Sequence, residues 1–405
     1  MHPSLTPQRE HYLLLTLAGI QFINILDFMI MMPLGPVLMS SFGLSTHEFG
    51  FLVSSYSFSS AFSGLLAATF IDRFERKRML LTIFILFGLS TLACGLAPGY
   101  STLIIARGLA GVFGGVMGAM VQTVVGDVIP FERRAHASGV VSTAFSLSTV
   151  AGVPLSLWLA NHIGWRAPFI LIAALAVVIV FIGLRVLPEL RNHISTNKRA
   201  HTFESMFAVL RDANHLRALL LSALVIFSGF MVIPYITLYS VRNVGISIHD
   251  IPFIYLAGGA ATLITARRIG KWADLHGKVK VYRLVAAAAV LPLFAVSQAG
   301  VVALWIWLAI TTTFFVLVSG RMIPLMAIVT SAAQPKLRGT FMSLNATMQS
   351  FAMGLATMLA GFIITQDSAG KIAGYEVVGY IAMASNVLAI TFVSGIVMHN
   401  QKSSL

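Results

Sequence analysis

Charged residues are scarce in this chain of 405 residues: they make up 10% of it, and only 14 residues are Asp or Glu. A soluble domain usually has about a quarter of its residues charged, because its surface faces water. Hydrophobic residues instead reach 57%, and the mean hydropathy is +0.87. The scarcity of charge excludes an ordinary soluble domain and indicates a membrane protein.

Cysteine is nearly absent, since Cys94 is the only one. An intramolecular disulfide and a metal site built on cysteines are therefore excluded. The histidines show no HExxH spacing and there is no Walker-type phosphate loop, so we predict no metal, no cofactor and no ATP-driven pumping. No nucleophile and base pair or signalling domain stands out, which disfavours a membrane-embedded enzyme or receptor.

Long apolar runs are abundant, and each is close to the roughly 20 residues that a helix needs to cross about 30 Å of hydrocarbon. A β-barrel would show shorter segments of alternating polarity, so the runs predict an all-α integral membrane protein. The first run lacks a small-residue cleavage site and is expected to remain as a span. The twelve expected spans are 11–35, 47–70, 79–97, 101–126, 137–161, 165–187, 216–240, 251–268, 281–300, 302–330, 339–364 and 375–397.

The net charge of +13 is distributed unevenly between the two sides of the membrane. If the N-terminus lies inside, Lys and Arg gather on that side, and only Arg166, Arg242 and Lys371 fall on the other. This asymmetry follows the positive-inside rule and predicts that both termini are cytoplasmic. It also removes the argument for a nucleic-acid partner that a basic composition would otherwise support.

The longest polar interval, residues 188–215, has six expected spans on each side. It predicts an N-terminal bundle over 1–187, a cytoplasmic linker over 188–215 and a C-terminal bundle over 216–405. Apolar residues in the linker follow helical spacing, which favours a short helix on the membrane face over a plain flexible linker. These apolar residues are Phe203, Met206, Phe207 and Leu210.

The two halves resemble each other. The stretch FIDRFERKR (70–78) follows the second span and GKWADLHGKVK (270–280) follows the eighth, while ERRAHASG (132–139) and KLRGTFMS (336–343) precede the fifth and eleventh. A duplicated unit of six spans is the interpretation, and such repeats usually flank a substrate site near the middle of the bilayer.

This pattern resembles the major facilitator superfamily over nearly the whole chain, and in particular its twelve-span branch of bacterial drug:proton antiporters and sugar exporters. The resemblance implies two pseudo-symmetric six-helix bundles that work by alternating access in the bacterial inner membrane. It implies a small-molecule substrate and protons as partners besides the lipid bilayer, and a monomer, as in most members.

The loop after the second span carries part of this resemblance, because the family has roughly G-x-x-x-D-R-x-G-R-K there. The resemblance implies a cytoplasmic gate in which loop aspartates contact a facing helix N-terminus and a loop arginine pairs with an acid at the end of span four. Ala68 and Glu75 replace the two glycines in the first copy. The matching residues are Asp72, Arg73, Arg76 and Asp127, and in the second copy Gly270, Asp274, Gly277 and Lys278.

Spans four and five carry two further family motifs. Arg107 with Gly111 matches R-x-x-x-G, which implies a role in coupling or in binding substrate charge, with a structural ion pair as the alternative. Overlapping GxxxG spacing in this span also predicts close helix packing. Gly152 and Pro154 resemble the antiporter motif G-x-P-x-G, whose backbone bends during transport, although Ser156 replaces its last glycine and leaves the direction open.

An aspartate in the first span interrupts the apolar stretch NILDFMIMM (24–32). A charge at a helix centre costs about 2.5–3.5 kcal/mol, so Asp27 is a functional candidate. Gln21, Asn24, Asp27 or Phe28, and Met31 share one helical face, which we expect to line a cavity. Asp27 is therefore predicted to carry the coupled proton, and a static salt bridge to an arginine is the alternative.

The charges expected within the spans are one acid, Asp27, and two bases, Arg107 and Arg321. An excess of arginine favours an anionic or hydroxyl-rich substrate over a cationic drug, for example a sugar, a carboxylate metabolite or a siderophore-like compound. Further residues expected to bind substrate are Gln122, Phe145, Tyr235, Tyr239, Asn345 and Gln349. The predicted function is proton-coupled export, and an uptake symporter or a facilitator on the same fold is the alternative.

Overall fold

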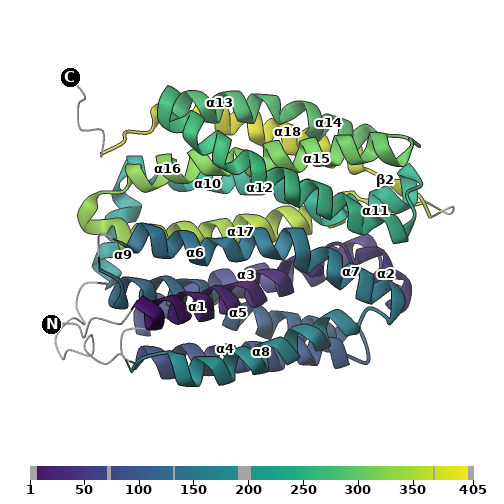
Figure 1. Cartoon of the computed structure of the whole chain (residues 1–405). Helices are drawn as coiled ribbons and strands as arrows, with labels where there is room; N and C mark the ends of the chain where they lie inside the picture. The colour runs from purple at the N-terminus through teal and green to yellow at the C-terminus, as the bar shows by residue number, and fades with distance from the viewer. Residues whose placement is uncertain (1–6, 71–73, 131–132, 190–201, 368–369, 400–405) are drawn as a thin grey trace.

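The computed structural model describes residues 7–70, 74–130, 133–189, 202–367 and 370–399. Twelve helical segments in these ranges are long and apolar enough to cross a membrane, which confirms the predicted number of spans and the all-α class. Figure 1 shows the helices as two groups lying side by side, with both ends of the chain at the same end of the molecule.

The first group holds six spans, and its fifth span is formed by three consecutive helical segments. Its elements are α1 (Pro7–Ile30), α2 (Gly35–Phe42), α3 (Thr46–Phe70), α4 (Arg76–Leu96), α5 (Tyr100–Val128), α6 (Arg134–Leu147), the π-helical turn η3 (Ser148–Gly152), α7 (Val153–His162) and α8 (Ala167–Val186).

The second group repeats this arrangement with more interruptions. Its spans are formed by α10 (Ala213–Val232) with η4 (Ile233–Tyr235), α11 (Ile236–Tyr239) and η5 (Ser240–Val244); α12 (Ile251–His276) after η6 (Ile248–Asp250); α13 (Lys278–Ala288) with α14 (Val290–Gln298); α15 (Leu304–Gly320) with α16 (Met322–Ala332); α17 (Arg338–Ile363) after η7 (Pro335–Leu337); and α18 (Tyr375–Phe392) with η8 (Val393–Gly395). The strands β1 (Thr365–Gln366) and β2 (Ile372–Ala373) form a small antiparallel hairpin between the last two spans.

Two predicted span boundaries were wrong. The first span ends at Ile30, not at residue 35, because Pro33 lacks the N–H that would continue the helix. The eighth span continues to His276, eight residues beyond the prediction, since charged residues alone do not end a helix. Gly277 ends it, with a φ of 92° that other residues rarely adopt.

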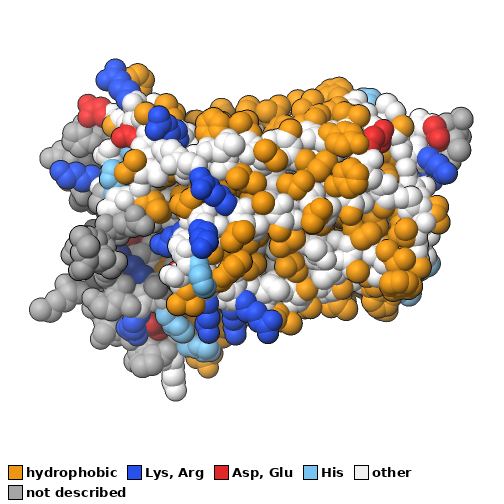
Figure 2. All heavy atoms as spheres, turned by 90° about the horizontal axis from the view of Figure 1, so that it is seen from above, with side chains coloured by type: hydrophobic (Ala, Val, Ile, Leu, Met, Phe, Trp, Pro, Cys, Tyr) orange, Lys and Arg blue, Asp and Glu red, His pale blue; other side chains and the backbone are white. Residues whose placement is uncertain are grey.

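The linker contains the predicted short helix, α9 (Thr202–Arg211). Val209 on this helix is fully buried against the second half, whereas Phe207 and Leu210 are exposed. An apolar exposed face is what a helix at the membrane surface requires. Figure 2 shows hydrophobic side chains around the middle of the molecule and Lys and Arg gathered at the end that holds both termini.

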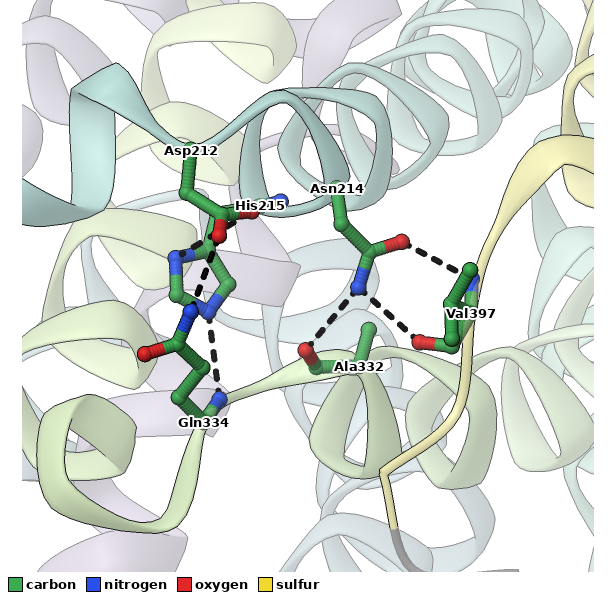
Figure 3. Close-up of polar contacts among 6 residues, drawn as sticks. All are labelled: Asp212, Asn214, His215, Ala332, Gln334 and Val397. Atoms are coloured by element: carbon green, nitrogen blue, oxygen red, sulfur yellow. Dashed lines mark hydrogen bonds and ion pairs between the residues drawn. The ribbon is translucent and has the colours of Figure 1, made fainter.

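A cluster of polar residues joins segments of the second half by hydrogen bonds at that same end (Figure 3). Asp212 caps α10 by accepting a hydrogen bond from the His215 backbone N–H at 2.9 Å, which lowers the pKa of its carboxyl group. The Gln334 side chain donates to Asp212 at 2.9 Å, and the Gln334 backbone N–H donates to His215 Nε2 at 3.1 Å. Asn214 adds a bond to the Val397 carbonyl, so the start of α10, the end of α16 and the C-terminal segment are joined.

Candidate functional site

A cavity of about 650 Å³ lies between the two halves. It is lined from the first half by α1, α3, α5, α6 and η3, and from the second half by α10, α12, α15, α16 and α17. Its walls are mainly apolar, and the large side chains on them include Phe28, Met29, Phe230, Phe315 and Met353. A concave, largely apolar site with a few polar groups is typical of small-molecule binding.

Hydrogen bonds join the halves at the end opposite the termini. Thr46 donates to the Ile364 carbonyl, Tyr235 donates to the Thr46 carbonyl at 3.2 Å, and Asn161 donates to the Ile248 carbonyl at 3.2 Å. Here α3 and α17 touch at Gly50 and Gly361, since a β-carbon on either glycine would lie 3.2 Å from the Cα of the other. The two halves are therefore in direct contact at this end.

Asp27 and Arg107 form an ion pair beside the cavity. Arg107 Nη1 donates to Asp27 Oδ2 at 2.7 Å, and Thr91 donates to Asp27 Oδ1 at 3.0 Å. Both charged residues are 0% exposed. Because a buried charge without a partner is very costly, the two residues depend on each other for their burial. Their pairing corresponds to the alternative considered for each of them from sequence.

Asn24 and Tyr56 separate this ion pair from the cavity. Both residues line the cavity, and the Tyr56 hydroxyl donates to Asn24 Oδ1 at 2.9 Å. The Tyr56 ring also covers the Arg107 guanidinium, whose carbon lies 4.7 Å from the ring centroid. The polar face predicted for the first span is thus divided, because Asn24 reaches the cavity whereas Asp27 points toward α4 and α5.

The glycines of α5 bring α3 close enough for these contacts. A β-carbon at Gly111 would lie 2.8 Å from Tyr56 Cα, and one at Gly115 would lie 2.7 Å from Ser60 Cα. No side chain fits at such distances, so the GxxxG spacing does bring these helices together, as predicted.

Arg321 lies on the opposite wall, at the junction between α15 and α16. It is 0% exposed, and all its hydrogen-bond acceptors are neutral: the Asn386 side chain, Ser228 Oγ at 3.4 Å and the Val225 carbonyl at 3.1 Å. Within the described ranges, no carboxylate lies within salt-bridge distance of it.

Three of the residues predicted to bind substrate line the cavity: Asn24, Phe145 and Arg321. Tyr235 and Tyr239 instead donate to backbone carbonyls of Thr46 and Ala299, and Gln122 is exposed and accepts a bond from Ser138. The others do not line the cavity either. Those residues are Gln21, Asp27, Asn345 and Gln349.

Sequence reasoning missed several polar residues that do line the cavity. Tyr56, Ser57 and Ser60 come from the stretch SSYSFSS (54–60), whose density of hydroxyl groups within a span could have drawn attention. Ser228 and Asn386, which hold Arg321, gave no comparable signal, because single Ser and Asn residues are common in membrane helices.

The residues predicted for the gate are only partly described. Arg76 Nε lies 3.1 Å from Asp127 Oδ2, so an arginine after the second span pairs with the acid at the end of the fourth. Glu75 accepts hydrogen bonds from the backbone N–H groups of Lys77 and Arg78 and thereby caps α4, which explains an acid in place of glycine. Asp72 and Arg73 lie outside the described residues.

The second copy of the gate motif is not a loop, which corrects the sequence prediction. Gly270 and Asp274 lie within α12, where Asp274 is exposed, and Lys278 begins α13 directly after Gly277. Because the helix continues through these residues, Gly277 provides the turn by itself.

Two six-span halves around a central cavity define the class of protein as a membrane transporter of small molecules. The sequence model of the Major Facilitator Superfamily matches residues 17–397. The protein therefore belongs to the Major Facilitator Superfamily. The proteins of this family are transporters and not enzymes.

Relatives from Bacillus subtilis (strain 168) agree with this family. The uncharacterised MFS-type transporter YceJ is 22% identical over 374 residues, which cover 90% of this chain and 92% of YceJ. Multidrug resistance protein 2 is 27% identical over 293 residues, or 70% of this chain and 72% of the relative. The uncharacterised MFS-type transporter YhcA is 31% identical over 172 residues, 42% of this chain, and this match spans only 32% of YhcA.

Solved structures share the fold at low sequence identity. A bacterial homologue of the human lysosomal transporter Spinster, in an inward-facing and occupied conformation, superposes with a TM-score of 0.76 at 16% identity, covering 99% of this chain and 100% of that one. A D-xylose–proton symporter gives a TM-score of 0.76 at 16% identity, covering 98% and 99%.

Proposed function

We propose that the protein is a proton-coupled secondary transporter that exports a small molecule by alternating access. The single observation that carries this proposal is the buried Asp27–Arg107 pair, which lies directly behind the cavity residues Asn24 and Tyr56. Titratable groups inside a membrane are expensive and are usually functional.

Protonation of Asp27 would change the forces around the site in a defined way. A neutral carboxyl group no longer balances Arg107, so the guanidinium would seek another anion or water. Because Tyr56 covers Arg107 and also bonds Asn24, a shift of Arg107 would disturb the cavity wall. Proton binding and substrate binding are coupled through this contact, and a proton entering from outside would drive substrate release.

Export is supported by span five and by two relatives. The π-helical turn η3 ends at Gly152, just before Pro154, and a β-carbon at Gly152 would lie 2.7 Å from Leu26 on the helix that carries Asp27. Bending at this turn would therefore move α1. A probable sugar efflux transporter of Mannheimia succiniciproducens, 24% identical over 226 residues, is named for efflux, and another relative is named Multidrug resistance protein 2. The alternative is uptake or facilitation, and the symporter among the structural neighbours has the same fold.

The remaining parts of the proposal follow from this mechanism. Both termini would lie in the cytoplasm of a bacterium, since Lys and Arg gather at their end of the molecule, and the protein would work as a monomer in the inner membrane. The gate at that end would use the Arg76–Asp127 pair. The substrate would be anionic or hydroxyl-rich, because Arg321 supplies a cation at the cavity wall without an acidic partner among the described residues.

Proteoliposomes that enclose a pH-sensitive dye test the coupling. Under an imposed proton gradient, sugars, organic anions, metal chelators and lipophilic cations would be added in turn to the wild type, to Asp27→Asn and to Asp250→Asn. Asp250 precedes α12 and lies outside the cavity, so its variant is the matched control. We expect a compound to trigger proton flux in the wild type and the control only. Equal passage of compounds in all three proteins without proton movement would instead define a facilitator.

A further inference from the structure

Arg321 is unusually placed for a buried charge, because its hydrogen bonds go only to uncharged groups. Nη1 donates to the Asn386 side chain and to Ser228 Oγ, Nη2 donates to the Val225 carbonyl and to Ser228 Oγ, and Nε has no partner in the described part of the chain. A guanidinium keeps its charge at any physiological pH. The positive charge is thus hydrogen-bonded but not neutralised.

Two features place this guanidinium directly behind the cavity surface, where a ligand would reach it by displacing one of its present hydrogen bonds. Arg321 belongs to the cavity wall together with Gly229, and a β-carbon at Gly229 would lie 3.6 Å from Arg321 Nη2. Glycine at this position therefore leaves no side chain over the guanidinium on that side. Both bonds to Ser228 are long, at 3.4 Å, so an anion could replace them at little cost.

The rest of the cavity restricts what the anion can be attached to. The large side chains on its walls include Phe28, Phe145, Phe230, Phe315, Met322 and Met353. A sugar would lose many hydrogen bonds to water on entering, and the Asn24 amide and the Ser, Thr and Tyr hydroxyl groups on these mainly apolar walls would replace only part of them. An aromatic or aliphatic body would gain by the same transfer.

We infer that the substrate is an amphipathic molecule with one anionic oxygen group, which binds Arg321, and an apolar body, which fills the cavity. Ser228 and Asn386 are positioning residues that set this preference, because they hold the guanidinium without an acid. Asn386 is fixed in turn by a bond from its Nδ2 to the Ala286 carbonyl at 2.6 Å. This inference rests on the proposed transport function and narrows its substrate from anionic or hydroxyl-rich compounds to amphipathic anions.

Three naphthalene probes of similar size and different charge test the inference. They are 2-naphthalenesulfonate, which is permanently anionic, 2-naphthalenemethanol, which is neutral, and 2-naphthyltrimethylammonium, which is cationic. Their binding to the full chain in lipid nanodiscs would be measured by equilibrium dialysis, with empty nanodiscs subtracted and no proton gradient present. The variants are Arg321→Gln, Ser228→Asp and the control Arg283→Gln, which removes an exposed arginine outside the cavity.

We expect the wild type and Arg283→Gln to bind the sulfonate about 30-fold more tightly than the other two probes. This factor corresponds to the lower end of the affinity usually lost when a buried charge loses its partner. Arg321→Gln should lose this preference. Ser228→Asp would supply the missing acid, so it should weaken sulfonate binding by a similar factor while leaving the neutral probe unchanged. If Arg321→Gln fails to fold, Ser228→Asp and the selectivity of the wild type still decide the question.

Equal or tighter binding of the cation by the wild type would overturn the inference, as would an unchanged preference in a folded Arg321→Gln or Ser228→Asp. The coupling proposal fails separately. Sulfonate binding that depends on Arg321 without proton flux that depends on Asp27 would refute proton coupling and leave this inference standing. Proton flux that depends on Asp27 but is triggered by cations alone would refute this inference and leave proton coupling standing.

Discussion

Arg107 and Arg321 are buried at different depths in the two halves of the molecule: Arg107 lies near the start of its span (Tyr100–Val128), and Arg321 lies past the middle of its own (Leu304–Ala332). Each lies on the fourth span of its half, is 0% exposed and contacts a residue on the first span of the same half. In the first half that residue is Asp27, at 2.7 Å, and in the second half it is Ser228, at 3.4 Å. The difference is that Arg107 is paired with an acid, whereas Arg321 is held only by neutral groups among the described residues.

The largest effect in this comparison should come from breaking the first-half pair. Asp27→Asn or Arg107→Gln alone leaves one buried charge without its partner, and we expect either to lower the free energy of unfolding by about 3–5 kcal/mol. The double variant removes both charges and should be less destabilised than the sum of the single variants. Denaturation of the protein in nanodiscs measures all three. Purely additive losses would mean that the two side chains do not interact.

The stability of the site around Arg321 should depend on its neutral acceptor Asn386, since no acid among the described residues pairs with this arginine. Asn386→Ala removes the bonds to Arg321 and to the Ala286 carbonyl, so we expect a loss of about 1.5–3 kcal/mol, as for hydrogen bonds to charged groups. Thr391→Ala on the same helix removes only an exposed bond within α18 and serves as the control. An Asn386→Ala variant as stable as this control would show that Arg321 is held by other contacts.

Tyr56 allows the cover over Arg107 to be separated from the bond to Asn24. Tyr56→Phe keeps the ring at its place 4.7 Å from the guanidinium carbon but removes the hydroxyl group, and we expect a loss of about 1 kcal/mol. Tyr56→Leu also removes the aromatic ring and should cost more. Thermal unfolding of the two variants in parallel measures the difference, and equal losses would indicate that the ring contributes nothing.

The smallest effect is expected at the surface, where Asp212 caps α10 far from either arginine. The hydrogen bond from the His215 backbone N–H lowers the folded-state pKa of Asp212, so the unfolded chain binds its proton more readily. The resulting stability is therefore present at neutral pH. It begins to be lost when the pH falls below the unfolded-state pKa of Asp212, about 4, and is gone once the pH falls below the lower folded-state pKa.

We expect this contribution to be below about 1 kcal/mol, because Asp212 is partly exposed to solvent. The measurement is the unfolding temperature of the wild type and of Asp212→Asn, at neutral pH and at about pH 3. The lower pH is chosen because it lies below the unperturbed pKa of aspartate. The wild type should lose slightly more stability on acidification than the variant does. The reverse order would contradict the lowered pKa.

Much of the fold was predictable from the chain. Runs of apolar residues must cross the bilayer as helices, which is why twelve spans and the linker helix α9 were predicted correctly. Boundaries failed at the end of the first span, where Pro33 overrides hydropathy, and at the end of the eighth, where the helix continues through charged residues as far as Gly277. The site was less predictable, because spacing along a helix says which residues share a face but not what that face meets. Tyr235 and Tyr239 share a spacing of four and both turn away from the cavity.

The amino-acid sequence by itself determined the membrane-spanning class, the number of spans, the duplication and the presence of Asp27, Arg107 and Arg321 within apolar stretches of the spans. Only the tertiary structure decided which arginine the acid neutralises. That choice depends on contacts between spans that are far apart in the sequence, since Arg107 on α5 meets Asp27 on α1 at 2.7 Å. The charge left over on Arg321 is a consequence of packing, since Ser228 and Asn386, not an acid, happen to be the groups that meet it.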